Sequence, residues 1–342
     1  MDAVLEYSHT IGFLSTEGRG FNNPIDMCIG PGGLLYVLNR AGPEVGIRLP
    51  YKRVSVCTSE GEYIQEFGTG GIKPGEFWWP SSIDYTTSGE LVVSDEALNR
   101  LSFFSPEGQF LRSFGESGDG PGLLNRPSYV KCSSEGILYI SDSLNHRIQR
   151  FTLAGEYIDS VVGIGELNFP WGLDLVGSDL LVCDWRDDSI KIWNQETQTR
   201  SVITSVTTGL FRPSHLITTN SGYRVISDWG NNRVIVLLGD EPRQILHGEA
   251  ESSEWASEYL LANPQEAEAR MLADLVPTLS GRQTSRRERS ASIESYFWGP
   301  TAITSNKSGH IFIVDSCRHR LQVYKETGAP NPWFENAYPS YS

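Results

Sequence analysis

Residues 77–114 read FWWPSSIDYTTSGELVVSDEALNRLSFFSPEGQFLRSF, and this stretch decides the fold. An aromatic run ends at Pro80, a β-prone run follows, and a Ser-Gly turn leads to a second β-prone run that ends at Asp95. A third run follows Arg100 and, after another turn, a fourth run ends at Phe114. Short apolar runs separated by Gly, Pro and Ser turns predict four antiparallel strands.

The same unit recurs along the whole chain of 342 residues. A Pro is followed by an Asp 15 residues later, or 14 in one unit, in the pairs Pro80/Asp95, Pro127/Asp142, Pro170/Asp184, Pro213/Asp228 and Pro300/Asp315. Pro24 opens a further unit, with Asn39 in the Asp place. A four-stranded repeat of roughly 40–50 residues is typical of propeller blades. We therefore predict an all-β fold, a six-bladed β-propeller that occupies 1–342 as one domain, with blades starting near residues 21, 77, 124, 167, 210 and 296.

The last unit is incomplete. Three strand patterns follow Pro300, so the last blade needs an outer strand from elsewhere. The N-terminal segment from Leu5 to Leu14 resembles the fourth strand of the other units. We expect this segment to complete the last blade, because closing the ring removes open sheet edges that would otherwise pair with other chains.

The residues around each repeat Asp carry a resemblance to a known family. The Asp is followed by Asn, then by Arg and an aliphatic residue, as in Asp95/Asn99/Arg100, Asp142/Asn145/Arg147, Asp228/Asn232/Arg233 and Asp315/Arg320. This pattern closely resembles the NHL repeat, and the resemblance covers nearly the whole chain outside two insertions. It implies a six-bladed NHL-type β-propeller, a fold that hosts many different functions.

The composition argues against a nucleic-acid partner and against a membrane. The net charge is −14, whereas a phosphate-binding face needs clustered Lys and Arg. The basic residues Arg282, Arg286, Arg287 and Arg289 lie close together in the sequence. We interpret them as part of a solvated loop, and the alternative is a local basic patch that binds a polyanion. The five Cys lack a Cys-x-x-Cys spacing and the N-terminal residues show no signal-like stretch, so we expect a cytoplasmic protein.

Two departures from regular spacing lie on one face of the predicted ring. The repeat Pro and Asp mark the end at which each inner strand begins and each second strand ends, which is the mouth of the axial channel. An enlarged loop from Arg40 to Lys52 lies there, and the longer segment 247–295 enters between the fifth and sixth blades. Because turns on the opposite face stay short, we predict function at the mouth.

The insertion 247–295 carries helix signals. The run from Asn263 to Glu266 predicts an N-cap, a Pro at the first helical position and a capping-box Glu, followed by an apolar stripe at helical spacing. An earlier helix, near Glu254 to Leu261, offers Trp255 and Tyr259 on one side. Three placements remain open: a lid over the channel mouth, packing on the rim, or the contact surface of a homo-oligomer.

Tryptophans gather at the positions expected to ring the mouth. The substrate-binding candidates are Trp79, Trp171, Trp185, Trp229 and Trp298, with Arg186 as a polar neighbour. An indole-lined pocket with a few polar groups is typical of small-molecule sites. For the aromatic residues that precede a repeat Pro, the alternative is a structural wedge between blades.

Three residues are candidates for catalysis. Arg40 directly follows the second strand of the first blade and is placed to bind a carboxylate or a developing oxyanion. His215, two places after Pro213, is a candidate general base, with a structural role between blades as the alternative. Asp26, two places after Pro24, departs from the other blades and is the third candidate. The repeat Asp residues form either a cation site or, as we prefer, acceptors for turn N–H groups and partners of their own repeat Arg.

The first blade also resembles that of peptidyl-α-hydroxyglycine α-amidating lyase, an NHL-type propeller with an Arg at this strand end before a long loop. The resemblance implies zinc bound through three His residues that directly follow blade prolines. This chain has Ser81, Trp171 and Thr301 at the corresponding places, so the zinc site of that family is absent.

These residues together predict a small-molecule enzyme of the lyase or hydrolase type, with its active site at the channel mouth under the insertion. The expected substrate is a small organic molecule. No redox cofactor is expected, and a divalent cation in the channel is left open. The alternative is a non-catalytic scaffold that binds a protein or peptide on the same face, which predicts an exposed apolar patch in place of a deep cavity.

Overall fold

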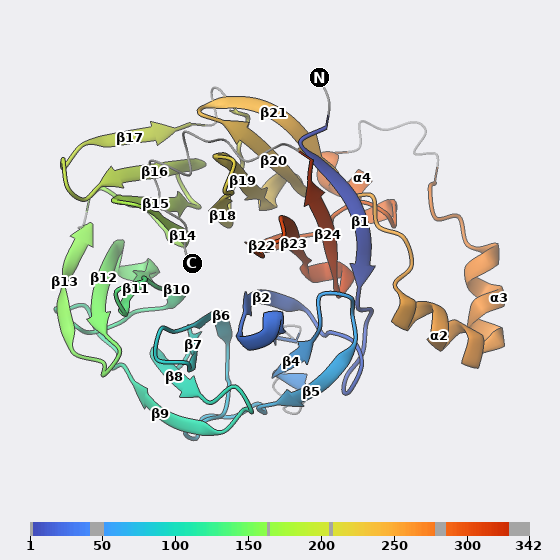
Figure 1. Cartoon of the computed structure of the whole chain (residues 1–342), viewed down its shortest axis with the longest axis horizontal. Helices are drawn as coiled ribbons and strands as arrows, with labels where there is room; N and C mark the ends of the chain where they lie inside the picture. The colour runs from blue at the N-terminus through green and yellow to red at the C-terminus, as the bar shows by residue number, and fades with distance from the viewer. Residues whose placement is uncertain (1–2, 42–50, 163–164, 205–207, 278–284, 328–342) are drawn as a thin grey trace.

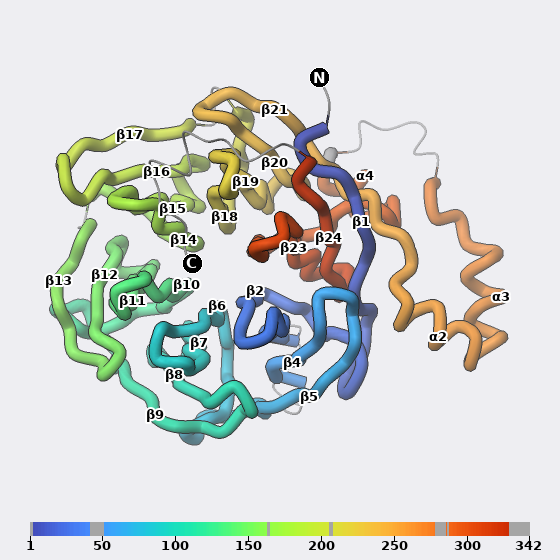
Figure 2. The backbone as a smooth tube through the Cα atoms, viewed as in Figure 1, coloured from blue at the N-terminus to red at the C-terminus, as the bar shows by residue number. Residues whose placement is uncertain are grey.

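The computed structural model describes residues 3–41, 51–162, 165–204, 208–277 and 285–327. Six four-stranded antiparallel sheets surround a central axis, so the predicted all-β six-bladed propeller is confirmed (Figure 1). The backbone trace shows how each outer strand at the rim leads to the inner strand of the following blade (Figure 2). Among the described residues, no helix is both long and apolar enough to span a membrane.

Each blade runs from an inner strand beside the axis to an outer strand at the rim. The first three blades are β2 (Pro24–Ile29), β3 (Leu35–Asn39), β4 (Arg53–Cys57) and β5 (Tyr63–Phe67); β6 (Pro80–Tyr85), β7 (Leu91–Asp95), β8 (Arg100–Phe104) and β9 (Phe110–Phe114); and β10 (Pro127–Cys132), β11 (Ile137–Asp142), β12 (Arg147–Thr152) and β13 (Tyr157–Val162). The last three are β14 (Pro170–Val176), β15 (Asp179–Asp184), β16 (Ser189–Asn194) and β17 (Arg200–Ile203); β18 (His215–Thr218), β19 (Tyr223–Asp228), β20 (Arg233–Leu238) and β21 (Glu241–Leu246); and β22 (Pro300–Ser305), β23 (His310–Asp315), β24 (Arg320–Glu326) and β1 (Leu5–Ile11).

The ring is closed by the N-terminal segment, as expected. Strand β1 pairs antiparallel with β24 and forms the outer strand of the sixth blade (Figure 1). The side chain of Gln244 from the fifth blade fastens this strand, because its Oε1 accepts hydrogen bonds from the N–H groups of Val4 at 2.9 Å and Leu5 at 2.8 Å. The sheet edge that the sixth blade would otherwise expose is therefore paired.

The core is divided among the interfaces between neighbouring blades. Phe77 precedes the second blade and packs with Val54 of the first blade and Ile83 of the second. Phe297 is likewise fully buried before the sixth blade, whereas Phe211 is largely exposed. Burying each such side chain contributes about 1.5–3 kcal/mol relative to exposure. The wedge alternative therefore holds for Phe77 and Phe297.

The spacing between repeat Pro and Asp follows from strand pairing. In the third blade Pro127 lies opposite Asp142 in the register of β10 and β11. The Asp142 carboxylate accepts hydrogen bonds from the N–H of Asn125 at 2.6 Å and from Nε of Arg147 at 2.8 Å. The Asp thus fastens the segment that enters its own blade, and its repeat Arg balances its charge.

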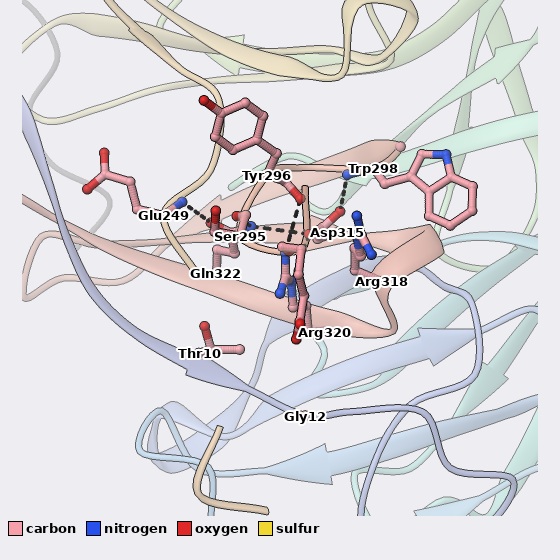
Figure 3. Close-up of polar contacts among 12 residues, drawn as sticks. Thr10, Gly12, Glu249, Ser295, Tyr296, Trp298, Asp315, Arg318, Arg320 and Gln322 are labelled. Atoms are coloured by element: carbon pink, nitrogen blue, oxygen red, sulfur yellow. Dashed lines mark hydrogen bonds and ion pairs between the residues drawn. The ribbon is translucent and has the colours of Figure 1, made fainter. Parts of the chain in front are cut away.

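The sixth blade repeats this arrangement (Figure 3). Asp315 accepts hydrogen bonds from the N–H of Trp298 at 2.7 Å and from Nε of Arg320 at 2.9 Å. Nη2 of Arg320 also donates to the carbonyl oxygens of Glu294 at 2.7 Å and Tyr296 at 3.1 Å. These bonds are the ones we preferred for the repeat Asp residues over a cation site.

A second repeated bond joins neighbouring blades at four of the six boundaries. The residue that ends the turn after the second strand adopts a left-handed conformation, with φ between 49° and 56° at Asn99, Asp188, Asn232 and His319. Its side chain accepts a hydrogen bond from the N–H of the residue before the next repeat Pro, at 2.8 to 2.9 Å, in the pairs Asn99/Arg126, Asp188/Arg212, Asn232/Gly299 and His319/Asn23. Because Asn and Asp tolerate this conformation well, the turn chemistry fixes where the pre-Pro residues lie.

The insertion forms α2 (Glu254–Ala262), α3 (Pro264–Leu272) and α4 (Arg286–Ser292). Helices α2 and α3 lie outside the ring beside β1, where Trp255 packs against Phe21 with ring centroids 5.7 Å apart (Figure 1). Helix α2 therefore packs on the rim, and the two helices do not cover the channel. Helix α3 contacts α2 and buries none of its own side chains, so the prediction of a homo-oligomer contact surface stays untested. The predicted start of α3 at Pro264 is correct, but the capping box is not formed because Glu266 accepts a hydrogen bond from the Tyr259 hydroxyl instead.

Helix α4 lies closer to the axis, against the fifth and sixth blades. The carbonyl oxygens of Ser290, Ala291 and Ile293 accept hydrogen bonds from Nη2 of Arg318, at 2.9 to 3.1 Å. Its N-terminus carries a capping box between Ser285 and Glu288. Of the basic residues noted in the sequence, three therefore belong to this helix, and Arg282 lies outside the described residues.

Candidate functional site

The mouth face is the end of the ring at which inner strands begin and second strands end. Its side chains come from two positions of each unit, the residue after the repeat Asp (or Asn39) and the residue before the Pro of the next blade. These two positions contact each other across the blade boundary in the pairs Arg40/Trp79, Glu96/Arg126 and Trp185/Arg212. The repeat itself therefore builds paired side chains on this face.

Three of the predicted substrate-binding tryptophans form a row on the mouth face. The ring of Trp185 lies between those of Trp171 and Trp229, with centroid distances of 6.1 and 6.0 Å, and all three side chains are partly exposed. The guanidinium group of Arg212 lies 4.5 Å from the Trp185 ring, and that of Arg287 from α4 lies 4.3 Å from the Trp229 ring. We call these five residues the tryptophan row. It presents indole faces and guanidinium planes together.

The other two predicted tryptophans lie outside the row, and each has a cation of its own. Trp79 is stacked with Arg40, whose guanidinium carbon lies 4.8 Å from the ring centroid. Trp298 has the guanidinium group of Arg318 at 5.4 Å. The structure thus brings three of the five candidate tryptophans into contact with one another.

The two cations of the tryptophan row have no acidic partner in the part of the chain that the structure describes. Within the described ranges, neither Arg212 nor Arg287 forms an ion pair, and the same is true of Arg186, which lies over the ring of Phe169 at 4.9 Å. Asp187, the nearest carboxylate in sequence to Arg186, is bound by Lys191 at 2.6 Å. In a chain of net charge −14, the tryptophan row therefore places two guanidinium groups that form no ion pair with a described residue beside aromatic surface.

Glu96 is a mouth residue that sequence reasoning did not select. It is only 3 % exposed, and its Oε2 accepts hydrogen bonds from Nε and Nη2 of Arg126 at 3.0 and 2.5 Å. Its Oε1 lies 3.8 Å from Nη1 of Arg40 and has no hydrogen-bond partner among the described residues. Burial lowers the pKa of Arg40, and the Glu96 carboxylate partly opposes this effect. The signal in the sequence was its position after the repeat Asp, which is the position of Arg40 in the first blade.

Asp26 has a structural role in the channel. It is almost fully buried on β2, and its two carboxylate oxygens accept hydrogen bonds from the N–H groups of Met27 at 2.8 Å and Ile83 at 2.9 Å. Since Ile83 belongs to β6, this bond joins the first two inner strands. Burial raises the pKa of Asp26 to about 7. Our catalytic interpretation of Asp26 is therefore replaced by that of a fastening between blades.

His215 also has a structural role in the channel, because both of its ring nitrogens are hydrogen-bonded. Its Nδ1 accepts a hydrogen bond from the N–H of Ile303 on β22 at 3.0 Å, so Nε2 is the protonated nitrogen and donates to the Tyr129 hydroxyl at 2.6 Å. The side chain is buried, and this burial lowers the pKa of His215 to about 3. Both ring nitrogens are engaged and the ring resists protonation, so the structural alternative describes His215 better than a general base at the mouth.

A polar cavity of about 180 Å³ lies in the channel, toward the ends of the inner strands opposite the mouth. Asp84, Lys131 and Asp174 line it together with His215 and Tyr129. Burial raises the pKa of Asp174. Within the described part of the chain, no group of three or more His, Cys, Asp or Glu side chains has the geometry of a metal site.

Comparisons with known proteins agree with this architecture. The model of the NHL repeat matches residues 297–324, which lie in the sixth blade and the segment before it. The chain is a six-bladed β-propeller that carries an NHL repeat, as the sequence resemblance implied. No curated protein matches the chain in sequence.

Solved structures resemble the chain in fold. A catalytically inactive virginiamycin B lyase from Staphylococcus aureus with quinupristin has a TM-score of 0.56 at 12 % identity, over 94 % of this chain and 99 % of that one. A nidogen/laminin complex has a TM-score of 0.51 at 18 % identity, over 66 % and 80 % of the chains. Hydrazine synthase from Kuenenia stuttgartiensis has a TM-score of 0.52 at 16 % identity, over 89 % and 84 %. The similar propellers thus include enzymes and a binding protein, and the likeness is one of fold.

Proposed function

We propose that this propeller is a non-catalytic binding protein that holds an acidic segment of a partner protein on its mouth face. The observation that carries the proposal is the tryptophan row, in which Arg212 and Arg287 are stacked on indole rings and have no acidic partner among the described residues. Stacked guanidinium groups are already ordered, so binding a carboxylate costs little side-chain entropy. Indole faces add apolar contact area beside each charge.

The structure does not support Asp26 or His215 as a general acid or base at the mouth, which the hypothesis of an enzyme requires. It required Asp26 or His215 to move a proton beside Arg40, but both side chains are buried in the channel and bonded to neighbouring strands. Of the three catalytic candidates, Arg40 alone lies on the mouth face. The tryptophan row consists of arginines and tryptophans, so it is suited to binding an anion and supplies no general base of its own. Glu96, the carboxylate beside Arg40, is buried and held by Arg126.

A short acidic segment fits this face better than a nucleic acid. The positive charge is local, whereas the chain as a whole carries −14 and repels a long polyanion. A peptide with a few Asp or Glu residues interacts mainly with the nearby arginines, because salt screens charges beyond about 10 Å. We therefore expect the affinity to fall as salt increases.

Fluorescence anisotropy tests the proposal with a short fluorescein-labelled peptide of alternating Glu and Ser. We expect binding at low salt, and a loss of about tenfold or more in affinity for Trp185→Ala and Arg212→Ala, since each removes a central contact. Arg224→Ala is the matched control, because Arg224 pairs with Asp240 at the short-turn end of the fifth blade.

Two results would overturn the proposal. One is that the acidic peptide binds no better than a matched peptide of alternating Lys and Ser. The other is that a single-stranded oligouridylate binds more tightly than the acidic peptide and loses this binding in Trp185→Ala, which would make the row a nucleic-acid site.

A further inference from the structure

The first three blades contribute a second feature of the mouth face, separate from the tryptophan row. It consists of Arg40, Lys52, Trp79, Glu96 and Arg126, which we call the carboxylate cluster. Arg40 and Nζ of Lys52 both lie over the Trp79 ring, at 4.8 and 5.0 Å. Arg126 is bound to Oε2 of Glu96, and Oε1 of the same carboxylate is buried with no hydrogen-bond donor among the described residues.

Among the described residues, the charges of this cluster do not balance. In that part of the chain two acidic groups, Glu96 and Asp95, face three cations, Arg40, Lys52 and Arg126. The Asp95 carboxylate is already used by backbone N–H groups, including that of Trp78 at 2.7 Å. Repulsion from Arg40 contributes to lowering the pKa of Lys52, after burial. One additional carboxylate would neutralise the cluster.

Glu96 sets a second condition for the ligand, which is a hydrogen-bond donor for its buried Oε1. A buried carboxylate oxygen without a donor is unfavourable, and a ligand N–H group satisfies it. Nη1 of Arg40 lies 3.8 Å from this oxygen, so the anion and the N–H group of the ligand must be close together. The last residue of a peptide meets this condition, because its carboxylate and its N–H are attached to the same Cα. The side-chain carboxylate of an internal Asp or Glu lies one or two bonds farther from the N–H of its own residue.

We propose that the carboxylate cluster recognises the free carboxyl terminus of the bound segment. The terminal carboxylate pairs with Arg40, and the N–H of the last residue donates to Oε1 of Glu96. Lys52 is buried and its Nζ donates to the Trp78 carbonyl, so it adds positive charge behind Arg40 without direct contact with the ligand. This inference rests on the proposed function, and it adds that the segment ends at the first three blades while its acidic side chains lie on the tryptophan row.

The test compares two versions of one acidic peptide, with a free carboxyl terminus or a carboxyl-terminal amide, both labelled at the amino end. We expect the free acid to bind the wild-type protein about tenfold more tightly than the amide. Arg40→Gln removes this preference. Glu96→Gln also removes it, since the Gln carbonyl is taken by Arg126 and its amide nitrogen then faces the ligand N–H. Arg212→Ala weakens both peptides equally and leaves the ratio unchanged.

The ratio of the two affinities distinguishes recognition from a structural role, because a general loss of folding lowers both affinities together. Thermal unfolding of Arg40→Gln and Glu96→Gln checks that they fold. If only one of the two variants folds, that variant alone is enough to test the preference for the free acid. If the wild-type protein binds free acid and amide equally, the inference is wrong while the proposed function stands. If neither peptide binds, both are wrong.

Discussion

The mouth face and the channel beneath it use polar side chains in opposite ways. In the channel, Asp26, Asp84, Asp174 and His215 each accept a hydrogen bond from a backbone N–H of the next inner strand, at 2.8 to 3.0 Å. At the mouth, Arg212 and Arg287 have no acidic partner among the described residues, and Glu96 keeps a free oxygen. The same repeat therefore places polar side chains that join neighbouring strands in the channel, and charged groups without such partners at the mouth, where we propose that a ligand binds.

The largest expected effect is the pH dependence of folding stability that arises from the buried groups of the channel. Asp26 has its pKa raised from an ordinary value of 3.8 to about 7, so its contribution to stability is full below pH 3.8 and is lost as the pH rises through 7. The change amounts to about 4 kcal/mol over this window. His215 acts in the opposite direction, because its pKa is lowered to about 3 and stability is lost as the pH falls from 6.5.

Asp26→Asn removes one of these two opposing contributions. We expect the variant to lose stability more steeply than the wild-type protein as the pH falls from 7 to 4, because the His215 effect is no longer offset. Urea unfolding at several pH values measures this difference. A parallel pH dependence in the two proteins would show that the Asp26 carboxyl is not buried as described.

His215→Ala is expected to have a smaller effect that is still large. It leaves the Tyr129 hydroxyl and the Ile303 N–H without partners in the channel, which costs about 2–4 kcal/mol. If His215 were instead a proton carrier for chemistry at the mouth, stability would change little. Urea unfolding at pH 7 decides between the two, and peptide binding by the folded variant should equal that of the wild-type protein.

The fold was predictable because the spacing between each repeat Pro and Asp reveals how the first two strands of the blade pair. The separation of Pro127 and Asp142 equals the separation of the two residues that face each other across the first hairpin of the blade, and the other units repeat it. Closure by the segment after Leu5 was predictable because the last unit has three strand patterns and this segment resembles the missing fourth strand. The docking of α2 was not, because helix signals identify where a helix begins and contain no information on its partner, here Phe21 beneath Trp255.

For the candidate site, the sequence predicted only the face of the propeller on which it lies. The turn that follows each repeat Asp placed Trp185 and Trp229 at the mouth, and the structure brings them within 6.0 Å. The directions of Asp26 and His215 could not be read from alternation, because the pairing register is irregular between Pro24 and Asp26 and strand β18 begins only at His215. The position of Glu96 after the repeat Asp also placed it at the mouth, but it was not selected as a candidate because its role depends on Arg126, which lies just before the next blade.

The smallest expected effect tests the mouth side of the comparison. Arg212→Ala should cost less than about 1 kcal/mol of stability, because an exposed guanidinium over an indole contributes little to folding. Arg147→Ala is the matched control, since that Arg is buried against Asp142 at 2.8 Å and its loss should cost about 3–5 kcal/mol. Urea unfolding compares the two. If Arg212→Ala proves as destabilising as Arg147→Ala, the mouth arginines hold the ring together, and their lack of acidic partners no longer indicates a ligand.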